Sequence, residues 1–172
     1  MDIVLILNNI RATGNVGSIL RTADGFGVSK VIFSGYTPRV NDERVLPHLR
    51  EKLNKQISKT ALGAEEYVEN YACDDIKAEL ENLKAEGYRI VGLENNLEDE
   101  RLIVFRKENF IKISERVGDK VVLILGEEVE GIDYSLYDMI DVFLEIPMQG
   151  RKESFNVSVA TGICLFGLRN LD

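Results

Sequence analysis

The chain has 172 residues, of which 45% are hydrophobic and 29% charged, which is typical of a globular protein of one domain. Two cysteines, a single histidine and no apolar run of the ~18 residues that span a bilayer argue against a disulfide framework, a metal site and a membrane span. The net charge of −8 disfavours a nucleic-acid-binding surface over the whole molecule.

The charge is unevenly distributed along the chain. Residues 1–60 hold 9 Lys and Arg against 5 Asp and Glu, a net charge of +4, whereas residues 61–172 hold 12 against 24, a net charge of −12. Such an asymmetry marks a partner-binding face or arises by chance, and charge alone favours neither interpretation. The first residues predict a strand rather than a signal peptide, so we expect a cytoplasmic protein with a single domain over residues 1–172.

The N-terminal third is predicted to contain a strand, a helix and a second strand, at residues 3–7, 15–26 and 30–35. Asn15 is suited to cap the helix and Gly27 to end it. Residues 36–60 carry two of the three prolines and many charges, and they predict a long, exposed, partly helical loop.

The rest of the chain continues this alternation. We predict strands at residues 88–93, 120–126 and 141–147, and helices at residues 74–87, 107–116, around 134–137 and 156–170. The short apolar run 102–105 is an edge strand or one helical turn. Alternating strands and helices predict an α/β fold, a parallel sheet covered on both faces, whose ligands bind at the carboxyl ends of the strands.

Three polar segments that contain glycine follow predicted strands. The first, residues 8–27, is neither a Walker A loop nor a dinucleotide fingerprint, but the start of its helix, near Gly14 and Gly17, is suited to bind an anion. Arg21 on this helix needs a partner: either it pairs with an acid such as Glu128, or it clamps a phosphate or substrate.

The second segment, residues 123–132, places several acids after a buried strand, and the third, residues 146–160, follows the last strand. In the third, Gly150 is expected to permit an unusual turn, and Ser154 or Asn156 to cap the last helix. Serine hydrolysis is disfavoured because His48, the single histidine, lies in a polar loop and no nucleophile-elbow sequence accompanies it.

Together the three segments resemble the signature motifs of the SpoU (TrmH) family of SPOUT RNA methyltransferases. The first motif is carried by Asn15, Gly17, Arg21, Thr22, Ala23, Phe26 and Gly27, and the second by Gly126, Glu128 and Gly131. The third is carried by Ile146, Pro147, Met148, Gly150, Ser154, Asn156, Ser158 and Ala160. Residues 59–68 are also similar to the family, and Phe155 stands where Leu is usual.

The resemblance implies a C-terminal trefoil knot in the α/β fold, a homodimer, and S-adenosylmethionine (AdoMet) held by the knot loops without a metal. The cofactor would contact Leu93, Glu94, Leu125, Gly126, Ile146, Met148, Phe155, Asn156 and Ala160. The implied activity is 2′-O-methylation of ribose in a structured RNA, with transfer RNA slightly favoured over ribosomal RNA.

The resemblance also points to Arg21 as the catalytic arginine. Because arginine rarely loses its proton, we expect Arg21 to clamp the substrate phosphate while that phosphate or a water accepts the proton. Asn15 and Asn156 would orient the ribose and Arg21, Glu128 would hold Arg21, and Ser154 would complete the pocket. The candidate RNA-binding residues are Arg11, Arg39, Arg44, Arg50, Lys52, Lys55 and Lys59.

Three other functions stay open. The first is a catalytically inactive RNA-binding protein on the same fold, against which the intact motifs argue. The second is a nucleotide-dependent enzyme of Rossmann-like fold, disfavoured by the missing phosphate-binding motifs. The third is methylation of a target other than RNA, or of an RNA base.

Overall fold

The computed structural model describes residues 1–171. Its centre is a seven-stranded sheet in which every neighbouring pair of strands is parallel, with the order β3-β2-β1-β6-β4-β7-β5. The strands are β1 Asp2–Asn8, β2 Lys30–Ser34, β3 Asn70–Cys73, β4 Arg89–Leu93, β5 Leu102–Val104, β6 Lys120–Leu125 and β7 Val142–Glu145. The parallel α/β fold is confirmed, and residues 102–104 form an edge strand.

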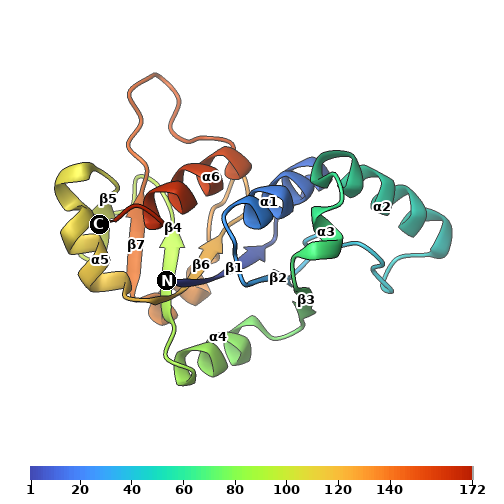
Figure 1. Ribbon diagram of the computed structural model, residues 1–172, viewed down its shortest axis with the longest axis horizontal. Helices are drawn as coiled ribbons and strands as arrows, with labels where there is room; N and C mark the ends of the chain where they lie inside the picture. Colours follow the sequence, from blue (N-terminus) through green and yellow to red (C-terminus); the bar gives the residue numbers. More distant parts are fainter. Residues whose placement is uncertain (172) are drawn as a thin grey trace.

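Helices cover both faces of the sheet (Figure 1). They are α1 Thr13–Gly25, α2 Pro47–Ala61, α3 Ala64–Tyr67, α4 Ile76–Ala85, α5 Phe110–Val117 and α6 Val157–Leu168, with 3-10 turns η1 Lys107–Asn109 and η2 Tyr134–Met139. Alternate residues of β1 point to opposite faces: Leu5 packs in the cluster that α1, α5 and α6 cover, and Ile6 in the cluster that α4 and η2 cover. Both are fully buried.

Two predicted boundaries are wrong. The first helix begins at Thr13 and its N-cap is Ala12, because the amide of Asn15 contacts side chains of other loops. Residues 47–61, expected within a partly helical loop, form the continuous helix α2, which buries only Ile57 and Ala61. So little burial gives the sequence a weak helical periodicity, although Pro47 at the start of α2 is a typical first helical residue.

A strand and a turn also differ from expectation. Strand β3 was not predicted because it is a four-residue edge strand whose side chains are only half-buried. Gly150 does not adopt the left-handed conformation that would make glycine necessary there. Within residues 1–171, no helix combines the length and apolarity needed to cross a membrane.

Strands β1, β6, β4 and β7 are neighbours in the sheet, so the loops that follow them meet at one edge. The loop after β7 rises above the sheet before the chain returns into α6 (Figure 1). All three motif segments follow one of these strands. The fold therefore gathers the motifs at the carboxyl edge, where a parallel sheet binds its ligands.

Candidate active site

Glu128, in the loop after β6, binds the segment that leads from β1 into α1. Its carboxylate accepts hydrogen bonds from the backbone N–H groups of Arg11 and Ala12, at 3.2 and 3.3 Å, and from the side-chain amide of Asn15 at 3.0 Å. Both backbone donors precede Thr13, so the segment that leads into α1 binds the protein's own carboxylate, whereas anion binding by the N–H groups of the helix itself stays a prediction.

Asn15 extends this contact to the third motif. Its Oδ1 accepts a hydrogen bond from Nδ2 of Asn156 at 3.1 Å. Oδ1 of Asn156 in turn accepts from the backbone N–H and the hydroxyl of Ser158, at 2.9 and 2.7 Å, and caps α6. A continuous network, Glu128–Asn15–Asn156, therefore joins the three motif segments.

The network keeps Glu128 ionised. Partial burial acts to raise the pKa of this carboxyl group, but hydrogen bonds from the N–H of Arg11 and the amide of Asn15 outweigh burial, and the pKa lies below its ordinary value. Neighbouring Glu127 is also held below its ordinary pKa, chiefly by the N–H groups of Glu130 and Val129. Both acids are therefore poor proton acceptors.

A cavity of about 450 Å³ opens beside the network. Eight of the nine residues predicted to contact the cofactor line it: Leu93, Glu94, Leu125, Gly126, Ile146, Phe155, Asn156 and Ala160. Met148 does not line the cavity, whereas Glu128 and Ser154 do. The lining combines apolar side chains with carboxylates.

The side chains of Glu94 and Asn95 bind the surrounding loops to one another. Oε2 of Glu94 accepts a hydrogen bond from the N–H of Ile132 at 2.9 Å, and Nδ2 of Asn95 donates to the carbonyl of Glu153 at 3.1 Å. Sequence reasoning missed the part played by Asn95, although its place directly after β4 was a usable signal.

Close backbone contact explains two glycines of the second motif. A Cβ on Gly126 would lie 2.2 Å from the carbonyl carbon of Gly131, and Gly131, with a φ of +74°, would place one 2.2 Å from Oε2 of Glu94. The N–H groups of Glu127 and Gly131 donate to each other's carbonyls at 2.9 and 3.0 Å. Glycine is therefore required for the tight turn that forms one wall of the cavity.

Within one chain Arg21 lies apart from this site, so a contact between Arg21 and Glu128 of the same chain is not formed. Arg21 lies six positions after Asn15, which places the two side chains about 120° apart around α1. Arg21 is exposed and does not line the cavity. Among residues 1–171, no hydrogen bond or ion pair joins Arg21 to Glu128, which binds Arg11, Ala12 and Asn15 instead.

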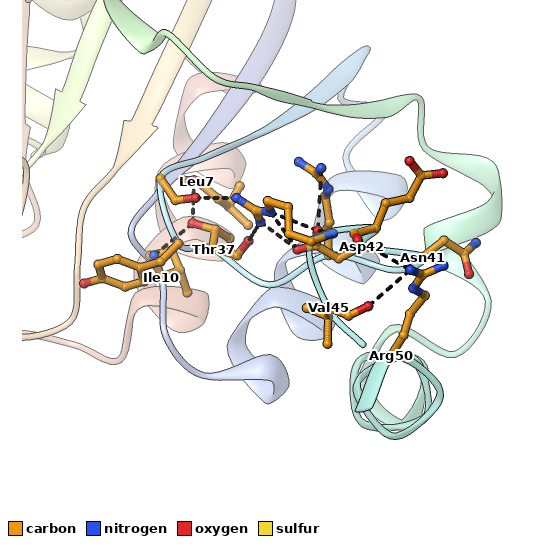
Figure 2. Close-up of polar contacts among 12 residues, drawn as sticks. Leu7, Ile10, Thr37, Asn41, Asp42, Val45 and Arg50 are labelled. Atoms are coloured by element: carbon orange, nitrogen blue, oxygen red, sulfur yellow. Dashed lines mark hydrogen bonds and ion pairs between the residues drawn. The ribbon is translucent and has the colours of Figure 1, made fainter. Parts of the chain in front are cut away.

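Three of the candidate RNA-binding arginines, two in the loop between β2 and α2 and one in α2, bind groups of that loop. Asp42 is buried, and Arg44 and Arg39 approach its carboxylate to 2.6 and 3.7 Å. The guanidinium of Arg44 holds the pKa of Asp42 below its ordinary value against the opposing effect of burial. Arg50 donates to the carbonyl of Val45 at 3.1 Å, and Figure 2 shows this contact beside those of Asp42.

The remaining candidates lie elsewhere. Lys52, Lys55 and Lys59 share an exposed face of α2 with His48 and Gln56. Arg11 is exposed at the edge of the site, and its guanidinium contacts Glu127 at 2.9 Å.

Comparison with known proteins identifies the family. The model of the SpoU rRNA Methylase family matches residues 2–166, nearly the whole chain. The chain belongs to the SpoU family.

Two relatives are about 30% identical to the chain over the aligned residues. A 23S rRNA (guanosine-2′-O-)-methyltransferase RlmB of Pseudomonas putida is 30% identical over 164 residues, covering 95% of this chain and 57% of that protein. An uncharacterized tRNA/rRNA methyltransferase of Borreliella burgdorferi is 31% identical over 96% of this chain and 63% of its own. The chain thus spans less than two thirds of these relatives.

Solved structures of SpoU proteins share the fold. An AdoMet-bound rRNA methyltransferase from Sinorhizobium meliloti superposes with a TM-score of 0.76 at 24% identity, over 98% of this chain and 56% of that one. A TrmH/SpoU tRNA modifying enzyme from A. aeolicus gives a TM-score of 0.74 at 23% identity, over 99% and 75%.

Proposed function

We propose that the protein transfers a methyl group from AdoMet to a ribose 2′-hydroxyl of RNA. The observation that carries the proposal is the cavity at the carboxyl edge of the sheet, bordered by the Glu128–Asn15–Asn156 network. The named relatives, which include a 2′-O-methyltransferase, support this activity.

The cavity fits AdoMet in size and chemistry. Its volume of about 450 Å³ is within the ordinary range of small-molecule sites. Leu125, Ile146 and Phe155 offer apolar surface to an adenine ring, and the carboxylates of Glu94 and Glu153 suit the positive charge of a sulfonium. When bound, AdoMet supplies an electrophilic methyl group.

The residues of the network act by position. Asn15 and Asn156 hold each other in place and orient the ribose at the mouth of the cavity. Glu128 fixes the segment between β1 and α1, and its lowered pKa excludes it as an effective base. The substrate phosphate or a water accepts the hydroxyl proton, and Arg21 clamps that phosphate with its bidentate guanidinium. Alignment of this kind can supply ~7–11 kcal/mol towards lowering a barrier.

Arg21 reaches the site in a homodimer. It is exposed on a part of α1 that faces away from the cavity, so we assign it to the active site of a second copy of the chain. Helix α6 supports such an assembly, because Val159, Ile163 and Phe166 form one exposed apolar stripe along it, 50, 37 and 62% accessible. A trefoil knot in the C-terminal region stays a prediction.

The identity of the RNA is the open part of the proposal. The RlmB relative acts on guanosine in 23S rRNA by name, whereas the initial preference for transfer RNA rests on the resemblance alone and stays a prediction. The exposed lysines of α2 offer positive charge to the phosphate backbone of either ribosomal or transfer RNA. A cytoplasmic location and a single-domain protein are also proposals.

The test is transfer of labelled methyl from AdoMet to ribosomal and transfer RNA fractions, followed by nuclease digestion. We expect label in a 2′-O-methylated nucleotide, near-complete loss with Arg21→Ala and with Arg21→Lys, and normal rates with Arg116→Ala, an exposed arginine of α5. Label in a base would contradict ribose chemistry. RNA binding without AdoMet binding would favour the alternative, a catalytically inactive RNA-binding protein.

A further inference from the structure

Tyr36 and Arg11 form an exposed pair beside the Glu128–Asn15–Asn156 network. The guanidinium carbon of Arg11 lies 5.6 Å from the ring centre of Tyr36, and Nε of Arg11 lies 3.3 Å from the tyrosine hydroxyl. The same Nε lies 2.9 Å from Oε1 of Glu127, whose side chain is buried. The side chain of Tyr36 is 51% accessible, so part of its aromatic ring is exposed to solvent beside the site.

The backbone around Tyr36 is fixed on both sides. Gly35 has a φ of +62° and leaves room for Asn9, whose Oδ1 accepts the N–H of Tyr36 at 3.3 Å. Thr37 is fully buried, and its hydroxyl donates to the carbonyl of Leu7 at 2.8 Å and accepts from the N–H of Ile10 at 3.1 Å. Figure 2 shows Thr37 between these two residues.

Arg44 braces the same turn from the other side. Its Nη1 donates to the carbonyl of Gly35 at 2.9 Å and its Nη2 to that of Thr37 at 3.4 Å, so it binds the residues before and after Tyr36. Buried Asp42 holds the guanidinium by two of its nitrogens. The loop thus presents a large aromatic side chain to solvent from a rigid support, which is how a binding residue is preorganised.

We propose that Tyr36 and Arg11 form a stacking platform that binds a base of the RNA substrate next to the methylated ribose. This inference rests on the proposed function. An aromatic ring and a guanidinium plane are the surfaces on which proteins stack unpaired RNA bases. The platform and the network are adjacent, because the backbone N–H of Arg11 donates a hydrogen bond to Glu128. Glu127 and Tyr36 orient Arg11, and Arg44 is a positioning residue for Tyr36.

The test compares Tyr36→Ala with Tyr36→Phe in the full chain. Phenylalanine keeps the ring and loses the hydroxyl contact with Arg11, so stacking predicts near-normal behaviour for Tyr36→Phe. For Tyr36→Ala it predicts a KM for RNA, and an RNA dissociation constant measured without AdoMet, raised about tenfold, with AdoMet affinity unchanged. Tyr67→Ala is the control, because Tyr67 is exposed, 78% against 51% for Tyr36, but precedes β3, at the amino ends of the strands.

The measurements on the two Tyr36 variants decide whether Tyr36 and Arg11 form a stacking platform. Unchanged RNA affinity in Tyr36→Ala, or equal losses in Tyr36→Ala and Tyr36→Phe, would overturn the platform. A changed melting temperature or AdoMet affinity in Tyr36→Ala would also overturn it, since the ring would then support the fold. Absence of methyl transfer by the wild-type protein would refute the proposed function alone, because RNA binding without AdoMet still tests the platform.

Discussion

The turn around Gly126 offers a sharp test of how the cavity is built. In Gly126→Ala the new Cβ would lie 2.2 Å from the carbonyl carbon of Gly131 and 2.3 Å from the nitrogen of Ile132, both backbone atoms. Ordinary contact requires the turn to move outward by about 1 Å. That movement breaks the paired hydrogen bonds between Glu127 and Gly131, at 2.9 and 3.0 Å.

The loss of stability in Gly126→Ala can be worked out from these contacts. Two backbone hydrogen bonds are worth ~1 kcal/mol each, and overpacking adds ~1–3 kcal/mol, so the free energy of unfolding should fall by about 3–5 kcal/mol. For a chain of this size that lowers the Tm by roughly 10 °C. Because Leu125 and Gly126 line the cavity, we also expect AdoMet affinity to fall at least about tenfold.

Thermal unfolding by circular dichroism and AdoMet titration by calorimetry measure the two effects. The matched control is Gly150→Ala, in the third motif, where a Cβ meets no atom within 4 Å and φ is not left-handed. It should change the free energy of unfolding by no more than ~0.5 kcal/mol. If Gly126→Ala melted and bound AdoMet like Gly150→Ala, the argument that this backbone contact shapes the cavity would be refuted.

Three further predictions concern assembly and pH. Mixed dimers of one Arg21→Ala chain and one Asn156→Ala chain, purified through two tags, should recover about half the wild-type rate although each parent is inactive. One of the two active sites in such a dimer combines an intact Arg21 with an intact Asn156 from the other chain. An inactive mixed dimer would place Arg21 in its own chain's site. Phe166→Glu should yield monomers by sedimentation, whereas an unchanged mass would exclude the α6 stripe as the interface. Arg101 lowers the pKa of Asp99 to about 2 from 3.8, so this pair stabilises the fold fully above pH 3.8 and loses its effect as the pH falls through 2. In urea unfolding, Asp99→Asn should therefore be less stable than wild type at pH 7 and approach its stability as the pH falls below 2, and a difference independent of pH would contradict the assignment.

The sheet was predictable where burial left a strong pattern. β6 is buried along almost its whole length and reads as a continuous apolar run. The pattern fails where an element buries little: α2 covers only Ile57 and Ala61, and β3 is a short, half-buried edge. Gly17 explains how α2 still packs on α1, because a Cβ there would lie 2.2 Å from Oγ1 of Thr60. That contact is tertiary and leaves no local signal.

The site was predictable as a set of loops but not as a set of pairs. Spacing placed Asn15, Glu128 and Asn156 at the same edge of the sheet, because parallel strands deliver their loops there. It did not decide whether Glu128 binds Arg21 or the segment before α1. That choice depends on where the helix begins and how it is rotated. Beginning at Thr13, α1 directs Asn15 towards Glu128 and leaves Arg21 in solvent.

The charge asymmetry of the sequence overstates the surface that is free to bind RNA. Formal charge counts every arginine of residues 1–60 alike, yet Arg39 and Arg44 neutralise the buried carboxylate of Asp42, and Arg50 is used on backbone carbonyls. A charge paired in this way releases few counterions when a phosphate approaches. Besides Arg21, which is proposed to clamp a phosphate, the cations left for the RNA backbone include those on α2, where Lys52 and Lys59 form no ion pair with any described residue. If Tyr36 stacks on an RNA base as proposed, Arg44 contributes to RNA binding indirectly, by fixing the turn that presents Tyr36.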